Sequence, residues 1–147
     1  MTRIGFMSDL HLDSNQFGHF EQQTLKDVLK KARIDHLHIA GDLSNNLTKI
    51  SLPFIEDLRQ ELPISFNLGN HDMLGLSEQE ISGYDFHVQQ FGQTKLVSFS
   101  GWYDYSFVPE KSKEEHLRTK TNFWFDRRLE RHLDDSSITV HILQKLE

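Results

Sequence analysis

Three short, mostly apolar segments, each followed directly by polar residues, constrain this sequence more than any other feature. They are residues 4–7, 36–40 and 64–68. Two segments between them, 18–33 and 52–62, carry apolar residues at helical spacing. Strand, helix, strand, helix and strand in this order predict right-handed crossovers and a parallel sheet. We therefore expect an α/β fold with a mainly parallel sheet and flanking helices.

Polar residues follow each predicted strand and form the main candidate site. The carboxyl ends of parallel strands meet at one edge of a sheet, where ligands collect in such folds, so we expect these residues to lie together. The candidate residues are Asp9, His11, Asp42, Asn70, His71 and Asp72.

The first four of these residues suit divalent cations. Asp9 and His11 are two positions apart in an extended chain, so their side chains point to the same side and offer one ion an oxygen and a nitrogen. Asp42 adds a carboxylate that can bridge two ions. Asn70 offers an amide oxygen, a neutral ligand that leaves a second ion strongly electrophilic.

His71 and Asp72 are the candidate catalytic residues. His71 is placed to protonate a leaving group or to hold a phosphate oxygen, and Asp72 to orient the other ring nitrogen. Gly41 and Gly69 give the backbone freedom to turn sharply beneath the metals. Each motif alone is also typical of turns and strand-end caps. Their joint occurrence after three successive strands favours a site.

Taken in order, three motifs resemble the first three signature blocks of the calcineurin-like metallophosphoesterases. They are Asp9-x-His11, Gly41-Asp42 and Gly69-Asn70-His71-Asp72. The segment Gly-Trp-Tyr-Asp at 101–104 is similar to bacterial members of the family. The resemblance implies a four-layer αββα sandwich. Residues 1–147 would form its first half, as a single and apparently truncated domain.

The resemblance also implies the chemistry, which is metal-dependent hydrolysis of phosphate esters. Asp9, His11 and Asp42 would hold one divalent ion, and Asp42 would bridge to a second ion held by Asn70. A metal-bound hydroxide at this dinuclear site would attack phosphorus, and His71 would assist the leaving group. Oxygen and imidazole ligands accept Mn, Fe, Zn or Ni, and we expect Mn.

Two departures from the family pattern refine this expectation. Protein phosphatases of the family follow Gly-Asp with a pattern ending in Asp-Arg-Gly, whereas residues 43–46 read Leu-Ser-Asn-Asn. This difference favours phosphodiesters or small phosphorylated molecules as substrates. The family's later blocks, which supply three more ligands, are not found in the sequence, and His141 is a weak candidate for one of them.

The missing blocks leave an alternative to the enzyme. It is a catalytically incompetent fragment that binds metal or phosphate, either as a truncated product or as a chain completed by a partner. An incomplete sandwich would also leave apolar sheet surface uncovered, which favours a homo-oligomer that covers it.

Composition bears on partners and location. The net charge is −6 and no run of lysine or arginine forms a basic stripe, which argues against nucleic acid as a tight partner. The chain has no cysteine, an N-terminus unlike a signal peptide, and no apolar run near the roughly 18–20 residues of a membrane span. We therefore expect a cytoplasmic protein that avoids membranes and acts on a small phosphorylated substrate.

Beyond residue 80 the pattern changes. Segments 84–91 and 94–99 suit a hairpin, and a charged helix is expected at 111–120. A helix is also expected at 138–146, where a β-branched run leaves a strand as the alternative.

Several aromatic and cationic side chains in this region have two readings. Trp102, Tyr103 and Tyr105 suit packing better than a substrate pocket. Arg127 and Arg128 suit a solvated helix face better than a phosphate contact.

Overall fold

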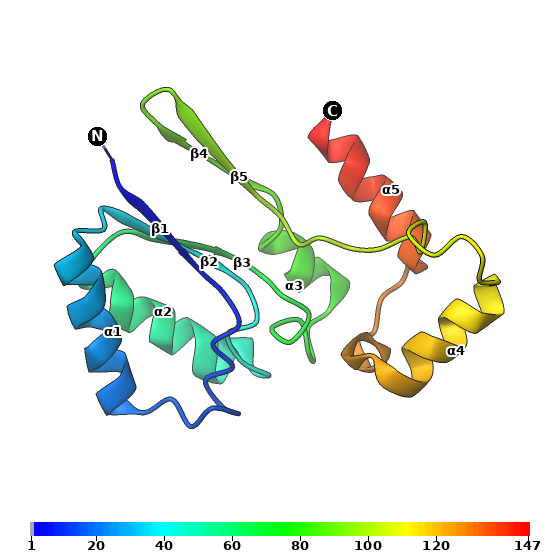
Figure 1. Cartoon of the computed structure of the whole chain (residues 1–147), viewed down its shortest axis with the longest axis horizontal. Helices are drawn as coiled ribbons and strands as arrows, with labels where there is room; N and C mark the ends of the chain where they lie inside the picture. Colours follow the sequence, from blue (N-terminus) through cyan, green and yellow to red (C-terminus); the bar gives the residue numbers. More distant parts are fainter. Residues whose placement is uncertain (1) are drawn as a thin grey trace.

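A three-stranded parallel sheet organises the first half of the chain (Figure 1). The computed structural model describes residues 2–147. The sheet and its helices comprise β1 (Ile4–Met7), α1 (His19–Ala32), β2 (His36–Ala40), α2 (Leu52–Arg59) and β3 (Ile64–Asn67). Both strand pairs, β1 with β2 and β2 with β3, are parallel, which confirms the predicted α/β arrangement.

Both helices cover the same face of this sheet. The strand order follows the chain order, so two right-handed crossovers place α1 and α2 on one side. Leu37 and Ile39 of the central strand are almost fully buried there against Leu29 of α1 and Ile55 and Leu58 of α2. This apolar layer fixes the strands and therefore the loops that leave their carboxyl ends.

The opposite face of the sheet carries a polar network. Ser65 Oγ lies 2.8 Å from His36 Nε2 and 2.9 Å from His38 Nδ1, and His38 Nε2 lies 3.0 Å from Asn67 Oδ1. Phe6, which is 63% exposed, is a large apolar side chain on this face. This face thus combines a buried polar network with the exposed apolar side chain of Phe6.

The second half of the chain is built from a hairpin and short helices. The elements are α3 (Glu78–Gly83), β4 (His87–Phe91), β5 (Thr94–Ser98), α4 (Lys113–Phe123), a 3₁₀ turn η2 (Phe125–Arg128) and α5 (Asp135–Leu146). Strands β4 and β5 pair in antiparallel fashion, as the sequence predicts. The C-terminal segment is helical, and its N-cap is Asp134. No helix among residues 2–147 has the length and apolar character needed to cross a membrane.

Candidate metal centre

The loop that leaves β1 runs directly beside the loop that leaves β2. The backbone N–H of Asp9 donates to the carbonyl of Gly41 at 3.1 Å, and the N–H of His11 donates to the carbonyl of Asp42 at 3.1 Å. These two bonds continue the strand pairing past the end of the sheet. They place the Asp-x-His motif beside the Gly-Asp motif.

Two glycines allow the loops after β2 and β3 to approach closely. Gly41 has a φ of +80°, and a Cβ there would lie 2.3 Å from the backbone nitrogen of Gly69. A Cβ on Gly69 would lie 2.1 Å from the Asp42 carboxylate. Both distances are far below van der Waals contact, so only glycine permits this approach. The Asp42 side chain consequently lies directly over the Gly-Asn motif.

Three non-glycine residues of the site adopt left-handed backbone conformations. Their φ angles are 58° at Asp9, 42° at His11 and 55° at Asp42. Each such residue costs roughly 1 kcal/mol or more and persists only where its surroundings hold it. Strained residues of this kind cluster at ligand-binding and catalytic sites, so their presence on two adjoining loops supports a functional role here.

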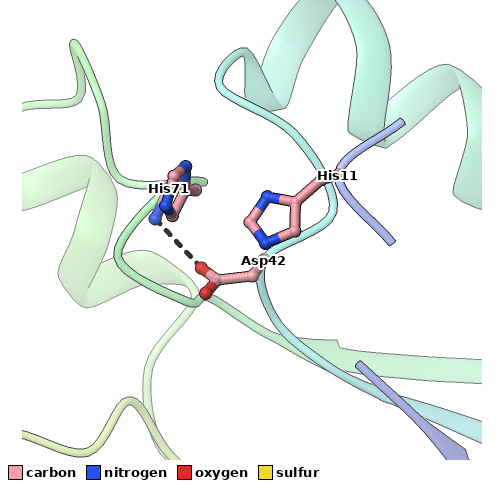
Figure 2. A group of neighbouring side chains, drawn as sticks. All are labelled: His11, Asp42 and His71. Carbon is pink, nitrogen blue, oxygen red and sulfur yellow. Dashed lines mark hydrogen bonds between the residues drawn. The ribbon is translucent and has the colours of Figure 1, made fainter. Parts of the chain in front are cut away.

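His11, Asp42 and His71 form a compact group of potential ligands (Figure 2). One ligand atom from each residue lies within 4.8 Å of the other two, and all three side chains are half-buried. The backbone N–H of His71 donates to Asp42 Oδ1 at 3.0 Å. Two imidazoles and a carboxylate are a donor set suited to first-row divalent metals. The residues present therefore fit a metal ion.

This group differs from the ligand set expected from the sequence. Asp9 is exposed and lies outside the trio, although its backbone is hydrogen-bonded at the same edge of the sheet. His71, which we expect to be catalytic, lies inside the trio. His141, the weak candidate for a later ligand, lies exposed on α5.

Asn45 and Asp13 fix the orientation of His71. Asn45 Nδ2 donates to Asp13 Oδ2 at 2.9 Å, and Asn45 Oδ1 lies 2.9 Å from His71 Nδ1. A carboxylate only accepts hydrogen bonds, so the amide nitrogen must face Asp13 and the amide oxygen must face His71. Nδ1 therefore carries a proton. Burial tends to raise the pKa of Asp13, but hydrogen bonds from Asn45 and the backbone outweigh it and lower the pKa.

Asp72 does not orient His71, contrary to the expectation from the sequence. Asp72 is 1% exposed, and its carboxylate accepts hydrogen bonds from the backbone of Leu43, Ser44 and Gly69 and from the Ser51 hydroxyl. Burial raises its pKa despite these backbone bonds. Asp72 ties the loop after β2 to the loop after β3, which is a structural role.

Asn70 lies at a second part of the site. Its Nδ2 donates to Asp126 Oδ1 at 2.7 Å. A hollow of about 270 Å³ is lined by Asp42 and Asn70 on one side and by Trp102, Tyr103 and Asp126 on the other. Burial, with the nearby Asp126 carboxylate, raises the pKa of Tyr103, so this hydroxyl stays protonated. The rings of Trp102 and Tyr103 stack on each other, with centroids 5.3 Å apart. Both residues therefore pack together and line the hollow.

The remaining cationic and aromatic candidates have structural contacts. Arg127 donates to the backbone carbonyl of Asn122 at 2.7 Å, near the end of α4. The Arg128 guanidinium lies 4.8 Å from the centre of the Phe125 ring. Tyr105 donates its hydroxyl to Asp135, as the Trp102 indole does at 2.8 Å.

Comparison with known proteins gives a family match and similarities to solved structures. The family model described as calcineurin-like phosphoesterase matches residues 2–143. The crystal structure of phosphopantetheinyl hydrolase (PptH) from Mycobacterium tuberculosis superposes with a TM-score of 0.65 at 18% identity, over 98% of this chain and 61% of that chain. A protein of unknown function, AQ665 from Aquifex aeolicus, gives a TM-score of 0.38 at 14% identity, over 82% of this chain and 73% of that chain. A search of curated proteins gave no match.

At this level of identity, the likeness to the Mycobacterium tuberculosis structure shows the fold. The present chain spans 61% of the length of that structure.

Proposed function

The chain belongs to the calcineurin-like phosphoesterase family, and from this premise we propose that it hydrolyses phosphate esters at the edge of its parallel sheet. The observation that carries the proposal is the convergence of His11, Asp42 and His71 at the carboxyl ends of three successive strands. These side chains come from separate loops. Their approach requires left-handed backbone at His11 and Asp42 and glycine at positions 41 and 69.

We propose a dinuclear site with Asp42 at its centre. Asp9 and His11 with Asp42 would hold one divalent ion, and Asn70 with Asp42 would hold the other, with Mn²⁺ favoured. Bound ions of this kind supply Lewis acidity and activate water near neutral pH. The carboxylate of Asp42 is suited to bridging because it lies between the loop that carries His11 and the loop that carries Asn70.

His71 would hold the proton that the leaving group takes. Its Nδ1–H stays on Asn45, so Nε2 is the nitrogen that faces the site and exchanges a proton. In the cationic form both nitrogens carry protons, and donation from Nε2 leaves the Nδ1 hydrogen bond intact.

The substrate class we propose is a phosphodiester or a small phosphorylated molecule. In this chain Asn45 follows Gly-Asp at the third position, where its side chain is occupied by His71 and Asp13. The loop therefore differs in sequence from the Asp-Arg-Gly pattern of protein phosphatases. The name of the structurally similar hydrolase refers to a phosphopantetheinyl group, which falls in the same class.

Hydrolysis of bis(p-nitrophenyl) phosphate in excess Mn²⁺ tests this function. Asp42→Asn keeps the size of the side chain but removes the charge that both ions share, so we expect turnover to fall at least about 100-fold. Asp27→Asn on α1 is the matched control and should leave turnover unchanged. Equal turnover in the two variants would contradict the site. Stoichiometric Mn²⁺ binding without turnover in the unaltered chain would instead support a binding-only fragment.

A further inference from the structure

We propose that Asp126 is a positioning residue that fixes the side-chain amide of Asn70 so that its oxygen is presented to the metal centre. Asp126 belongs to the 3₁₀ turn η2, 56 residues further along the chain. The inference rests on the proposed function, because that function makes Asn70 a metal ligand.

The Asn70–Asp126 hydrogen bond has a defined polarity. Asn70 Nδ2 donates to Asp126 Oδ1 at 2.7 Å, and both side chains are half-buried. An ionised carboxylate has no hydrogen to donate, so the amide nitrogen must face it. A charged acceptor also makes this bond stronger than a neutral one. The amide oxygen is thereby turned away from Asp126 and left for another partner.

Other contacts place η2 over the metal centre. The ring of Phe125 stacks on the imidazole of His71, with centroids 3.7 Å apart and an interplanar angle of 19°. Asp126 lines the same hollow as Asp42 and Asn70. Phe125 thus contacts His71, to which we assign proton transfer. The next residue, Asp126, contacts the proposed metal ligand Asn70.

Contacts on both sides of η2 anchor it in addition to the bond with Asn70. On one side, Trp124 packs its ring against Tyr103, with centroids 4.9 Å apart and nearly perpendicular planes. On the other side, Arg131 makes two hydrogen bonds to Glu78, at 2.9 and 2.8 Å. These anchors hold the Asp126 carboxylate in place before any metal binds. A ligand held in this way binds metal with less loss of side-chain entropy.

A purely structural role for Asp126 predicts something different. If Asp126 only ties two loops together, its removal should weaken folding and metal binding whether or not Asn70 is present. If Asp126 acts through the Asn70 amide, its removal should matter only when that amide is there. A double-mutant cycle separates the two cases.

The experiment is calorimetric titration of the full chain with Mn²⁺ alone, which needs no turnover. The proteins are the unaltered chain, Asn70→Ala, Asp126→Ala, the double variant and Asp126→Asn, each checked for folding by thermal unfolding. We expect Asp126→Ala to weaken Mn²⁺ binding about 10-fold, as removal of an outer partner of a ligand does. The same change in the Asn70→Ala background should have no effect. Asp126→Asn retains an acceptor oxygen and should bind Mn²⁺ close to normally.

Each other outcome overturns the inference in a recognisable way. Equal losses from Asp126→Ala with and without Asn70, or no rescue by Asp126→Asn, would reject the positioning role. A loss in Asn70→Ala with none in Asp126→Ala would reject the role of Asp126 but leave the proposed function standing. No effect of Asn70→Ala, or no Mn²⁺ binding by the unaltered chain, would contradict the assignment of Asn70 as a metal ligand. Either result would therefore also contradict the proposed dinuclear site.

Discussion

At the scale of single residues, His71 has two possible roles that make opposite predictions. It lies within 4.8 Å of the ligand atoms of His11 and Asp42, as a metal ligand would. Its Nδ1 is fixed by Asn45 and its ring by Phe125, as a proton donor requires. We propose the second role. The variant His71→Gln should then lower turnover about 100-fold or more while Mn²⁺ affinity changes little, because general acid catalysis contributes at least that factor.

The decisive comparison is between turnover and Mn²⁺ affinity in the same preparation. Asn45→Ala provides a graded companion, since it removes the acceptor for Nδ1 but leaves the imidazole in place. Its turnover should fall less than that of His71→Gln. A loss of Mn²⁺ affinity in His71→Gln as large as the loss of turnover would make His71 a ligand.

The residues of the site were predictable from the sequence only where they are local. Asp9, His11 and Asp42 each follow a recognisable strand, so the topology alone brings their backbones together. Asn45 and Asp126 carry no such signal, because their contacts depend on loops that meet in the folded chain. The position of Asp72 next to His71 in the sequence suggested a direct pair. The tight turn instead points Asp72 into the protein.

At the scale of elements, the Asp72 carboxylate joins the loops after β2 and β3. It accepts hydrogen bonds from three backbone N–H groups and from Ser51, in a position closed to water. Asp72→Ala leaves these donors without partners, and each buried donor without a partner lowers stability by roughly 1–3 kcal/mol. We expect the free energy of unfolding to fall by about 3 kcal/mol or more, measured by urea denaturation.

The control for this prediction is Glu110→Ala, which removes an exposed carboxylate with no hydrogen bond to either loop. It should change the free energy of unfolding by well under 1 kcal/mol. A loss in Asp72→Ala no larger than in this control would mean that solvent or a rearranged loop satisfies the donors.

The histidines of β2 make the fold sensitive to pH. Burial lowers the pKa of both His36 and His38 below the ordinary 6.5, and the neighbouring His38 lowers that of His36 further. The unfolded chain therefore takes up protons first as the pH falls. Stability is retained above about pH 6.5 and lost below it.

Urea denaturation at pH 7.5 and pH 5.5, with metal removed by EDTA, tests this direction. The unaltered chain should unfold at lower urea at the lower pH. The variant His36→Gln/His38→Gln should lose less between the same two pH values. A loss of the same size in the variant would assign the pH dependence to other groups.

The order of elements was predictable because periodicity is a local property. The apolar runs at 4–7 and 36–40 and the amphipathic segment at 18–33 match β1, β2 and α1 within a residue. The sequence does not predict helix α3, because its six residues are too few to show a helical period. The capping box of Ser77 and Glu80 is its one local signal. The choice of helix at 138–146 over a strand was correct, since packing of Ile138 and Ile142 on one face decides it.

At the scale of the whole molecule, polar contacts join the segment that follows β3 to the C-terminal part of the chain. Arg131 pairs with Glu78 at 2.8 Å, and Asn70 bonds to Asp126 at 2.7 Å. The C-terminal segments have their own centre at Asp135, which accepts from Trp102, Tyr105 and Lys120. The metal centre lies where these two parts of the chain meet. Metal binding should therefore stabilise the whole fold against unfolding.

Mn²⁺ should stabilise the protein against unfolding, because the proposed ligands come from loops that are close together only in the folded state. An ion that binds only the folded chain adds about 2.7 kcal/mol when its free concentration is 100 times the dissociation constant. We expect the melting temperature to rise with Mn²⁺ concentration and to return to its starting value with EDTA. Asp42→Asn should abolish most of this rise and Asp27→Asn none of it. The Asp42 carboxylate is the one ligand that both proposed ions share, and Asp42→Asn removes its charge. A rise of equal size in both variants would therefore mean that Mn²⁺ binds and stabilises the chain at another place.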